Sequence, residues 1–369
     1  MIGSTLTSHA GVRFARGQLT LSAEAQYQHD ENIFSNTSDV EDSIWTFTPS
    51  ARFERQAGVT TLTANAELAI SRFEDNGSED TEDPSFGINV AYIPSPKTEF
   101  QMGLSYARAT RANEQVLARV ESDDIDFNAE FRHFYSEKLG YTLKGSTDLS
   151  DQRTANFSDV DTYSLGIDSL YEFSPKLYFV GGANFSSSST SSTPGSRVSP
   201  DNNDFALDTG VEGDISPKVT GNIRAGYNWR NFDSNSFGAA TDSGYILNTN
   251  VLWSTTDTTA VRLFATRSFN VSSSDQSYIL QQIGLSVENS FYTQGSASLS
   301  VSHEDSEFSA SGIIPQRNDD AIVLTGRLGW ELRPGASVGA SFTYRDTDSD
   351  LAIADYSRRV WSLTARFSY

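Results

Sequence analysis

The chain has 369 residues, of which 37% are hydrophobic, and its 48 acidic against 27 basic residues give a formal net charge of -21. Its apolar runs all fall short of the roughly 18 residues that a membrane-spanning helix needs, so a helical membrane protein is excluded. The excess of acid argues against a nucleic-acid partner, and the absence of cysteine removes disulfides and thiolate metal sites.

The first clear element is predicted to begin near Gln18, where apolar residues fill every second position as far as Tyr27. Alternation with a period of two indicates a β-strand with one apolar and one polar face. The same pattern recurs at 125–132, 219–229, 322–331, 338–345 and 361–369. Helical periodicity of comparable length does not occur in the sequence, which therefore predicts an all-β protein.

The connections between these runs alternate between short and long ones. The short connections are 55–58, 94–96, 135–138, 174–176, 216–218, 254–258, 291–295 and 333–335. The long connections are polar and mostly acidic, and they are 34–42, 73–84, 108–124, 186–204, 231–243, 272–277, 303–320 and 345–355. A soluble sandwich has no such order, whereas transmembrane barrels have short periplasmic turns and long extracellular loops. We therefore predict a transmembrane, antiparallel, up-and-down β-barrel of about 18 strands over residues 18–369, in the bacterial outer membrane.

Aromatic residues gather near the strand ends on the apolar face. The predicted girdle residues are Tyr27, Phe53, Tyr135, Phe173, Trp229, Trp253, Trp330 and Trp361. Two such bands mark the membrane interfaces of a barrel in a bilayer. The alternative is that they are ordinary strand aromatics, because Tyr, Phe and Trp favour strands in any protein.

The polar face of the strands is predicted to line the lumen. The charged residues predicted there are Glu24, Arg52, Glu67, Glu130, Arg132, Asp168, Asp208, Glu212, Arg224, Arg262, Arg327, Arg345 and Arg366. The same face also carries Lys144 and seven further acids, which are Glu54, Asp126, Asp148, Glu172, Asp214, Glu288 and Glu331. Acids are therefore in excess over the whole face, so anions should be mildly disfavoured. The alternative is that these residues only pair with one another across neighbouring strands. Few aromatics fall on this face, so the sequence shows no aromatic track for sugars.

Barrels of 16 to 18 strands generally leave an aqueous channel, so a pore is the default function. The connection 108–124 contains RATRANEQVLARVE, which has the residues for one helical turn. It is our candidate for a constriction that folds inward, although an exposed outer loop is the favoured interpretation.

Residues 1–17 alternate only weakly and lack the basic and apolar regions of a secretion signal, so we expect a mature chain. A nineteenth barrel strand would place the two chain ends on opposite sides of the membrane. We interpret residues 1–17 as a periplasmic lead-in or a strand that binds a partner.

Two stretches resemble known proteins. The final RRVWSLTARFSY resembles the terminal strand of bacterial outer-membrane proteins, and the resemblance implies that Phe367 and Tyr369 are read by the barrel-assembly machinery. The stretch LSAEAQYQHDENIFSNTSDVEDSIWTFTPSARFERQ resembles the putative beta-barrel porin 2 family. The matching residues are Asp30, Asn32, Ile33 and Phe34, with Glu31 as the variable position, followed by Trp45, Pro49 and Ala51.

This resemblance implies a conduit for exopolysaccharide or capsule export that works with a periplasmic polysaccharide-export protein. Outer-membrane lipid and lipopolysaccharide would surround the barrel. Two other functions stay open: a general diffusion porin for small hydrophilic solutes, and a non-transporting anchor for an envelope-spanning machine. The lumen chemistry supports the porin equally well.

The sequence predicts no enzyme, cofactor or metal site. The histidine neighbourhoods His29-Asp30 and His303-Glu304-Asp305 are weak candidates for a hydrolase at the barrel rim, and an interfacial ring is the favoured interpretation. The segment Asp346–Asp350 copies the first ligands of a calcium loop. However, Leu351 and Ser357 stand where the glycine and the bidentate glutamate belong, so we expect a solvated acidic loop.

Overall fold

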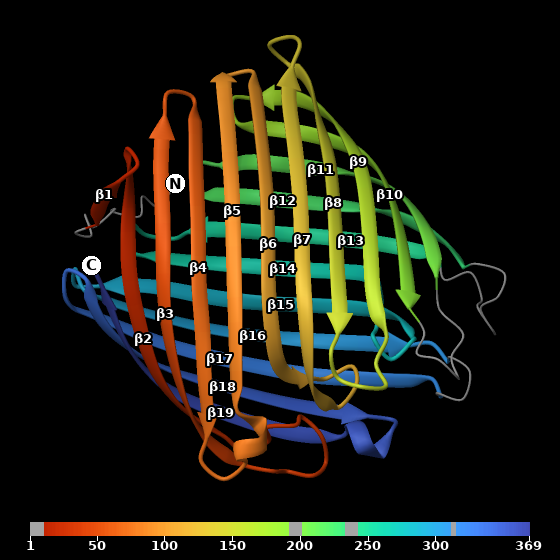
Figure 1. The fold of residues 1–369 in the computed structure, drawn as a ribbon. Helices are drawn as coiled ribbons and strands as arrows, with labels where there is room; N and C mark the ends of the chain where they lie inside the picture. Colours follow the sequence, from red (N-terminus) through yellow and green to blue (C-terminus); the bar gives the residue numbers. More distant parts are fainter. Residues whose placement is uncertain (1–10, 192–200, 233–242, 311–314) are drawn as a thin grey trace.

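The computed structural model describes residues 11–191, 201–232, 243–310 and 315–369. Within them, 19 strands form one sheet in which each strand pairs antiparallel with the next. The last strand pairs with the second, so β2–β19 close into the 18-strand barrel that the sequence predicted (Figure 1). None of the helices in these ranges is long and apolar enough to cross a membrane.

The first ten strands are β1 (Val12–Phe14), β2 (Gly17–Asp30), β3 (Asp42–Ala57), β4 (Thr60–Phe73), β5 (Thr81–Ser95), β6 (Thr98–Asn113), β7 (Ala118–Phe134), β8 (Leu139–Gln152), β9 (Asp159–Ser174) and β10 (Leu177–Ser191). The others are β11 (Asn202–Ser216), β12 (Val219–Phe232), β13 (Gly244–Ser254), β14 (Thr259–Val271), β15 (Ser277–Phe291), β16 (Gly295–Phe308), β17 (Arg317–Arg333), β18 (Ala336–Ser349) and β19 (Tyr356–Ser368). Two short 3-10 helices, η1 (Gly77–Glu79) and η2 (Ala352–Ala354), lie in the long connections.

The strands extend further toward the loop side than the alternation predicted. The connection expected at 108–124 is largely strand, because β6 reaches Asn113 and β7 begins at Ala118. The connection expected at 345–355 is strand over its first part, because β18 continues to Ser349. Alternation of apolar residues stops where the outer face leaves the bilayer, but backbone pairing does not need an apolar face. The sequence pattern therefore found the membrane-spanning part of each strand and missed its polar extension.

The outer face of the barrel is apolar. Leu165 is 69% exposed, Leu363 is 61% exposed and Trp361 is 52% exposed, which suits contact with lipid tails rather than water. A small buried apolar cluster lies at the loop end, where Ile33 packs with Ile44 and Phe73. The stability of the fold rests chiefly on strand pairing, which satisfies the backbone hydrogen bonds that lipid cannot.

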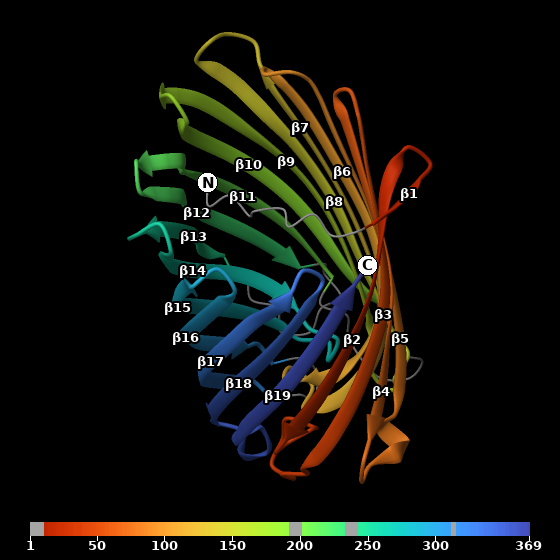
Figure 2. The same ribbon diagram turned by 90° about the vertical axis from the view of Figure 1, so that its left-hand side faces the viewer.

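The short strand β1 forms a hairpin with the start of β2, through the pairs Val12 with Leu19 and Phe14 with Gly17. It lies on the edge of β2 that β19 occupies further along, since β19 ends with Ser368 opposite Ser22. Figure 2 shows β1 beside β2 on the short-turn side. The described residues 11–16 thus contain one strand outside the barrel, β1, and the role of residues 1–17 as a lead-in or partner-binding segment stays a prediction.

Candidate functional site

The register of the strands identifies the side chains that point into the lumen. The predicted lumen residues all lie on this inner face, and they are Glu24, Arg52, Glu67, Glu130, Arg132, Asp168, Asp208, Glu212, Arg224, Arg262, Arg327, Arg345 and Arg366. The exposed apolar side chains lie on the opposite face. The part that the lumen residues play in permeation stays a prediction.

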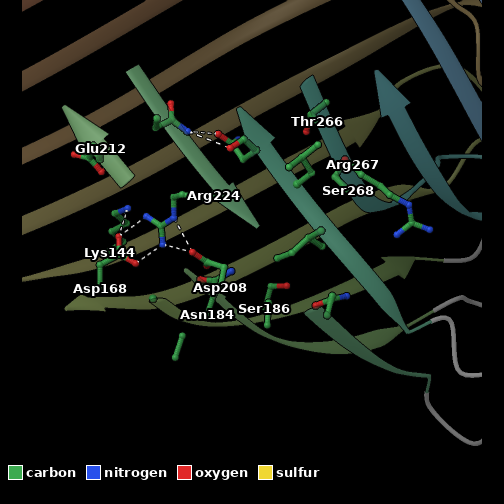
Figure 3. Close-up of a pocket in the computed structure, with 18 of the residues that line it drawn as sticks. Lys144, Asp168, Asn184, Ser186, Asp208, Glu212, Arg224, Thr266, Arg267 and Ser268 are labelled. Carbon is green, nitrogen blue, oxygen red and sulfur yellow. Dashed lines mark hydrogen bonds and ion pairs between the residues drawn. The ribbon is translucent and has the colours of Figure 1, made fainter. Parts of the chain in front are cut away.

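One ion network links the inner faces of β8, β9, β11 and β12 (Figure 3). The Arg224 guanidinium donates to both carboxylate oxygens of Asp168, at 2.9 and 2.7 Å, and to Asp208 at 2.6 Å. Lys144 Nζ lies 2.7 Å from Asp168. β10 lies between β9 and β11 and carries Gly182, which has no side chain and so leaves room for the network. These residues line a cavity of 890 Å³ on the inner wall.

Other predicted lumen charges differ in their pairing. Arg132 contacts Glu212 at 2.9 Å and Glu130 at 3.9 Å, and so joins β7 to β11. Arg52 lies 3.8 Å from Glu54, with both side chains more than half exposed. Within the described ranges, Glu24, Glu67, Arg262, Arg327 and Arg366 form no ion pair.

The β6–β7 hairpin leaves the wall and bends into the barrel. β5 and β6 stop pairing at Ser85 opposite Ala107, whereas β6 and β7 stay paired to Asn113 opposite Ala118. Beyond Ala107, Asp83 of β5 still accepts from the backbone nitrogen and the hydroxyl of Thr110, at 3.2 and 3.0 Å. The part of β6 beyond Ala107 has about six residues and spans about 20 Å at the usual rise of a strand. Figures 1 and 2 show the loop ends of β6 and β7 turning inward.

The end of this hairpin, residues 113–118, is called the tip below, and it contacts the opposite wall. Gln115 Nε2 donates to the Tyr278 hydroxyl of β15 at 2.7 Å. Glu114 pairs with Arg345 of β18 at 2.7 Å, and Arg317 of β17 donates to the backbone oxygen of Gln115 at 3.2 Å. In the order of the sheet, β15–β18 lie nearly opposite β6 and β7. The tip therefore crosses the lumen.

Glu114 is partly buried, and 41% of its side chain is exposed. Desolvation by the surrounding protein raises the pKa of its carboxyl above the usual value of 4.5, against the opposing effect of Arg345. The nearby carboxylates of Glu304 and Asp319 raise it further. The docked tip therefore favours the neutral form of Glu114 more than a solvated loop would.

The sequence favoured an exposed outer loop for 108–124, and this interpretation is wrong. The structure shows the alternative, in which this connection folds into the barrel. The sequence contained one signal for it. Val116, Leu117 and Val120 are apolar residues in a polar connection, and Val120 is only 3% exposed. The residues that bond the tip, Tyr278 and Arg317, are far away in the chain, so no local pattern could have identified them.

The histidine candidates do not assemble a catalytic group. His29 and Asp30 alternate to opposite faces of β2, where His29 contacts Ser43 and Asp30 binds Arg358. His303 contacts Asp320 at 2.9 Å rather than Glu304, which points inward to Arg345. Residues 346–349 are part of β18 and alternate between its faces, so they form no calcium loop. In the described part of the chain no cluster of His, Asp and Glu could hold a metal ion.

The predicted girdle residues lie on the outer face. Trp229, Trp253, Trp330 and Trp361 are between 37% and 52% exposed, and Phe173 and Tyr135 are more exposed still. Tyr27 packs against Trp45 with ring centroids 4.9 Å apart, and Phe53 packs against Phe14 of β1. Their role at the membrane interface stays a prediction.

The closed barrel, its apolar outer face and its charged lumen define an outer-membrane β-barrel of the porin type. The family model described as Putative beta-barrel porin 2 matches residues 9–369, and the chain belongs to this family. The family points to a channel and not to an enzyme. No curated protein matches the sequence.

Three solved structures from Pseudomonas aeruginosa resemble the fold. The ferric enterobactin receptor PfeA in complex with enterobactin is 7% identical with a TM-score of 0.51, and the match covers 97% of this chain and 82% of that one. OpdL is 10% identical with a TM-score of 0.51, covering 96% and 99%. OccK3 (OpdO) is 12% identical with a TM-score of 0.50, covering 96% and 95%. At these identities the likeness shows the fold alone.

Proposed function

We propose that the barrel is a water-filled pore for small hydrophilic solutes and that the tip of the β6–β7 hairpin sets its size limit. The observation that carries this proposal is the crossing of the lumen by residues 113–118, which dock on β15, β17 and β18. A barrel of this strand number is wide enough for an aqueous channel. Because the tip crosses that channel, it lowers the size of the largest solute that can pass.

The charge of the lumen supports a preference for cations. In the described ranges, the acids of the lumen face without an ion pair outnumber the unpaired Arg262, Arg327 and Arg366, and these acids are Glu24, Glu67, Asp126, Asp148, Glu172, Glu288 and Glu331. Asp126 lies directly opposite Asp148 in the register of β7 and β8. Charges of one sign along a narrow passage raise the local concentration of the opposite ion. Neutral solutes should pass according to size.

The test is single-channel conductance of the purified protein in a planar bilayer, with graded neutral polymers added to size the pore. We expect stable conductance, and a larger conductance and polymer limit when residues 113–118 are replaced by a two-residue Asn-Gly turn. Negligible conductance from both proteins would overturn the pore and favour a non-transporting anchor for an envelope-spanning machine.

A second candidate is a conduit for exopolysaccharide or capsule export with a periplasmic polysaccharide-export protein. Its support is the resemblance to the family and a lumen face with few aromatic side chains, on which a polar polymer would slide. A chain of sugars must pass the docked tip, so this function requires the partner to displace it. Oligosaccharide flux that appears only when the periplasmic protein is added would favour the conduit over the simple pore.

The assembly of the barrel also remains a proposal. Phe367 and Tyr369 end the outer face of β19, and both side chains are more than half exposed. This placement leaves them accessible to the barrel-assembly machinery before the barrel closes. Deleting Tyr369 should lower the yield of folded barrel in the outer membrane if the machinery reads this residue.

A further inference from the structure

We propose that the loop segment Asp30–Asn36, called the socket below, holds the β6–β7 tip across the lumen and that Asn36 is a positioning residue for the size limit. The inference rests on the proposed pore. It assigns a role to the residues between β2 and β3, which touch neither the bilayer nor a solute path directly.

The tip is a rigid unit that needs an anchor. The backbone nitrogens of Val116 and Leu117 donate to the carbonyl of Asn113, at 3.3 and 2.8 Å, and the side chain of Asn113 accepts from Gln115 N at 2.9 Å. Leu117 has a φ of 56°, so the turn ends in a left-handed residue. This turn directs the Leu117 carbonyl toward the socket, where Asn36 Nδ2 donates to it at 3.1 Å.

The socket is largely buried and is held by hydrogen bonds within the loop. Asn32 is 0% exposed, and its Nδ2 donates to the Asn36 carbonyl at 2.6 Å while its Oδ1 accepts from Asn36 N at 3.3 Å. Asn32 Nδ2 also lies 3.1 Å from Asp39 Oδ1. These bonds fix the backbone of Asn36 from both sides, so its side chain has little freedom to leave the tip.

The socket is in turn fastened to the last strand of the barrel. Arg358 of β19 donates to both oxygens of Asp30, at 3.0 and 2.6 Å, and to Ser35 Oγ at 3.0 Å. A bidentate pair of this kind is among the stronger polar contacts in proteins. Ile33 packs in the apolar cluster at the loop end. The socket is therefore part of the rigid wall, whereas the tip is held by contacts that can break separately.

Among the described residues, one hydrogen bond joins socket and tip, and its donor is the side-chain amide of Asn36, which permits a near-isosteric test. Asn36→Asp removes this donor, while the oxygen that accepts from Ser38 and the backbone bonds to Asn32 are retained. Loss of one such hydrogen bond should raise the undocked fraction of the tip about fivefold. Asn222→Asp is the matched control, because Asn222 is a lumen amide that bonds Asn248 and does not touch the tip.

The measurement is the polymer size limit and the single-channel conductance of the full chain. We expect Asn36→Asp to open more frequently to a state of larger conductance than the native chain. Asn222→Asp should not differ from the native chain in conductance or in polymer size limit. The native chain has no cysteine, so Gln115→Cys with Tyr278→Cys can be bridged by a short thiol-reactive linker. Bridging on the Asn36→Asp background should restore the wild-type size limit, which a general loss of loop structure would not allow.

Two outcomes separate this inference from the pore on which it rests. If the shortened tip raises the size limit but Asn36→Asp leaves it unchanged, the socket does not position the tip and the pore proposal stands. If Asn36→Asp widens the pore but the bridge fails to restore the limit, Asn36 acts by another route and the inference is also overturned. If neither the native chain nor the chain with the shortened tip conducts, both proposals fail.

Discussion

Two groups of polar contacts in the lumen differ in which strands they join: the network around Arg224 and the contacts of the tip. The network around Arg224 joins β8, β9, β11 and β12, which are close neighbours in one wall. The contacts of the tip join β6 and β7 to β15, β17 and β18, which lie nearly opposite in the barrel. Contacts within a wall join strands that the backbone already holds together, so breaking them costs the pairing of poorly exposed charges without moving a strand. Contacts across the lumen hold the tip in place, so breaking them moves the tip while every barrel strand stays paired. The first group should therefore govern stability and the second conductance.

The largest expected effect is a loss of stability when the network around Arg224 is broken. Arg224→Ala leaves Asp168 and Asp208 facing each other, with Lys144 as the remaining cation of the network. Removing one partner of a poorly exposed ion network should lower the free energy of unfolding by about 3 kcal/mol. Denaturant unfolding in lipid vesicles measures this loss. Arg327→Ala is the control, because Arg327 has no ion pair among the described residues. Equal losses for the two variants would contradict a structural role for the network.

Two neighbouring glycines on β10, Gly181 and Gly182, test the role of the network in stability by a second route. A Cβ at Gly182 would lie 2.6 Å from Asp168 Oδ1 and 2.9 Å from Asp208 Oδ2, whereas a Cβ at Gly181 meets nothing within 4 Å. Gly182→Ala should destabilise the barrel by about 2 kcal/mol through overpacking. Gly181→Ala on the outer face should change stability by less than about 0.5 kcal/mol. The comparison fails if the two variants unfold at the same denaturant concentration.

The tip should respond to pH through Glu114. The pKa of Glu114 in the docked state lies above the ordinary value of 4.5. Docking therefore has its full stability below about pH 4.5 and weakens as the pH rises through the raised pKa. The groups that face Glu114 are Arg345, Arg358, Glu304, Asp319, Tyr278 and Tyr356. We expect open-channel events to become more frequent above pH 4.5, and this trend should vanish in Glu114→Gln. An unchanged trend in Glu114→Gln would assign the titration to another group.

The smallest effect concerns ion selectivity. The acid excess of the lumen should give a modest cation preference in a salt gradient at 0.1 M, where the screening length is about 10 Å. The preference should decline toward 1 M salt, where this length falls to about 3 Å. Reversal potentials measure both. A preference that persists at 1 M salt would indicate a narrow charged site instead of a diffuse field.

Most of the fold could be predicted from the sequence, because a strand between lipid and water must alternate along the part that crosses the bilayer. Leu19 to Tyr27 and Trp361 to Phe367 show this alternation, and the register pairs the two strands that contain them. The inner face followed from the same argument. The tip could not be predicted, since its contacts from Gln115 to Tyr278 and from Asn36 to Leu117 join segments with no shared periodicity. The resemblance selected Asp30–Phe34 as a motif but gave no reason for it.

The seam between β19 and β2 has a consequence for folding. Leu21 exchanges backbone hydrogen bonds with Tyr369, at 2.9 and 2.7 Å, so the final residue pairs near the first barrel strand. Such pairing has the largest sequence separation that the chain allows, and closure must therefore be a late and slow event. Until then β2 presents an open edge that invites pairing with other chains. The short strand β1 already covers the first residues of that edge, and it can form locally, before the rest of the ring exists.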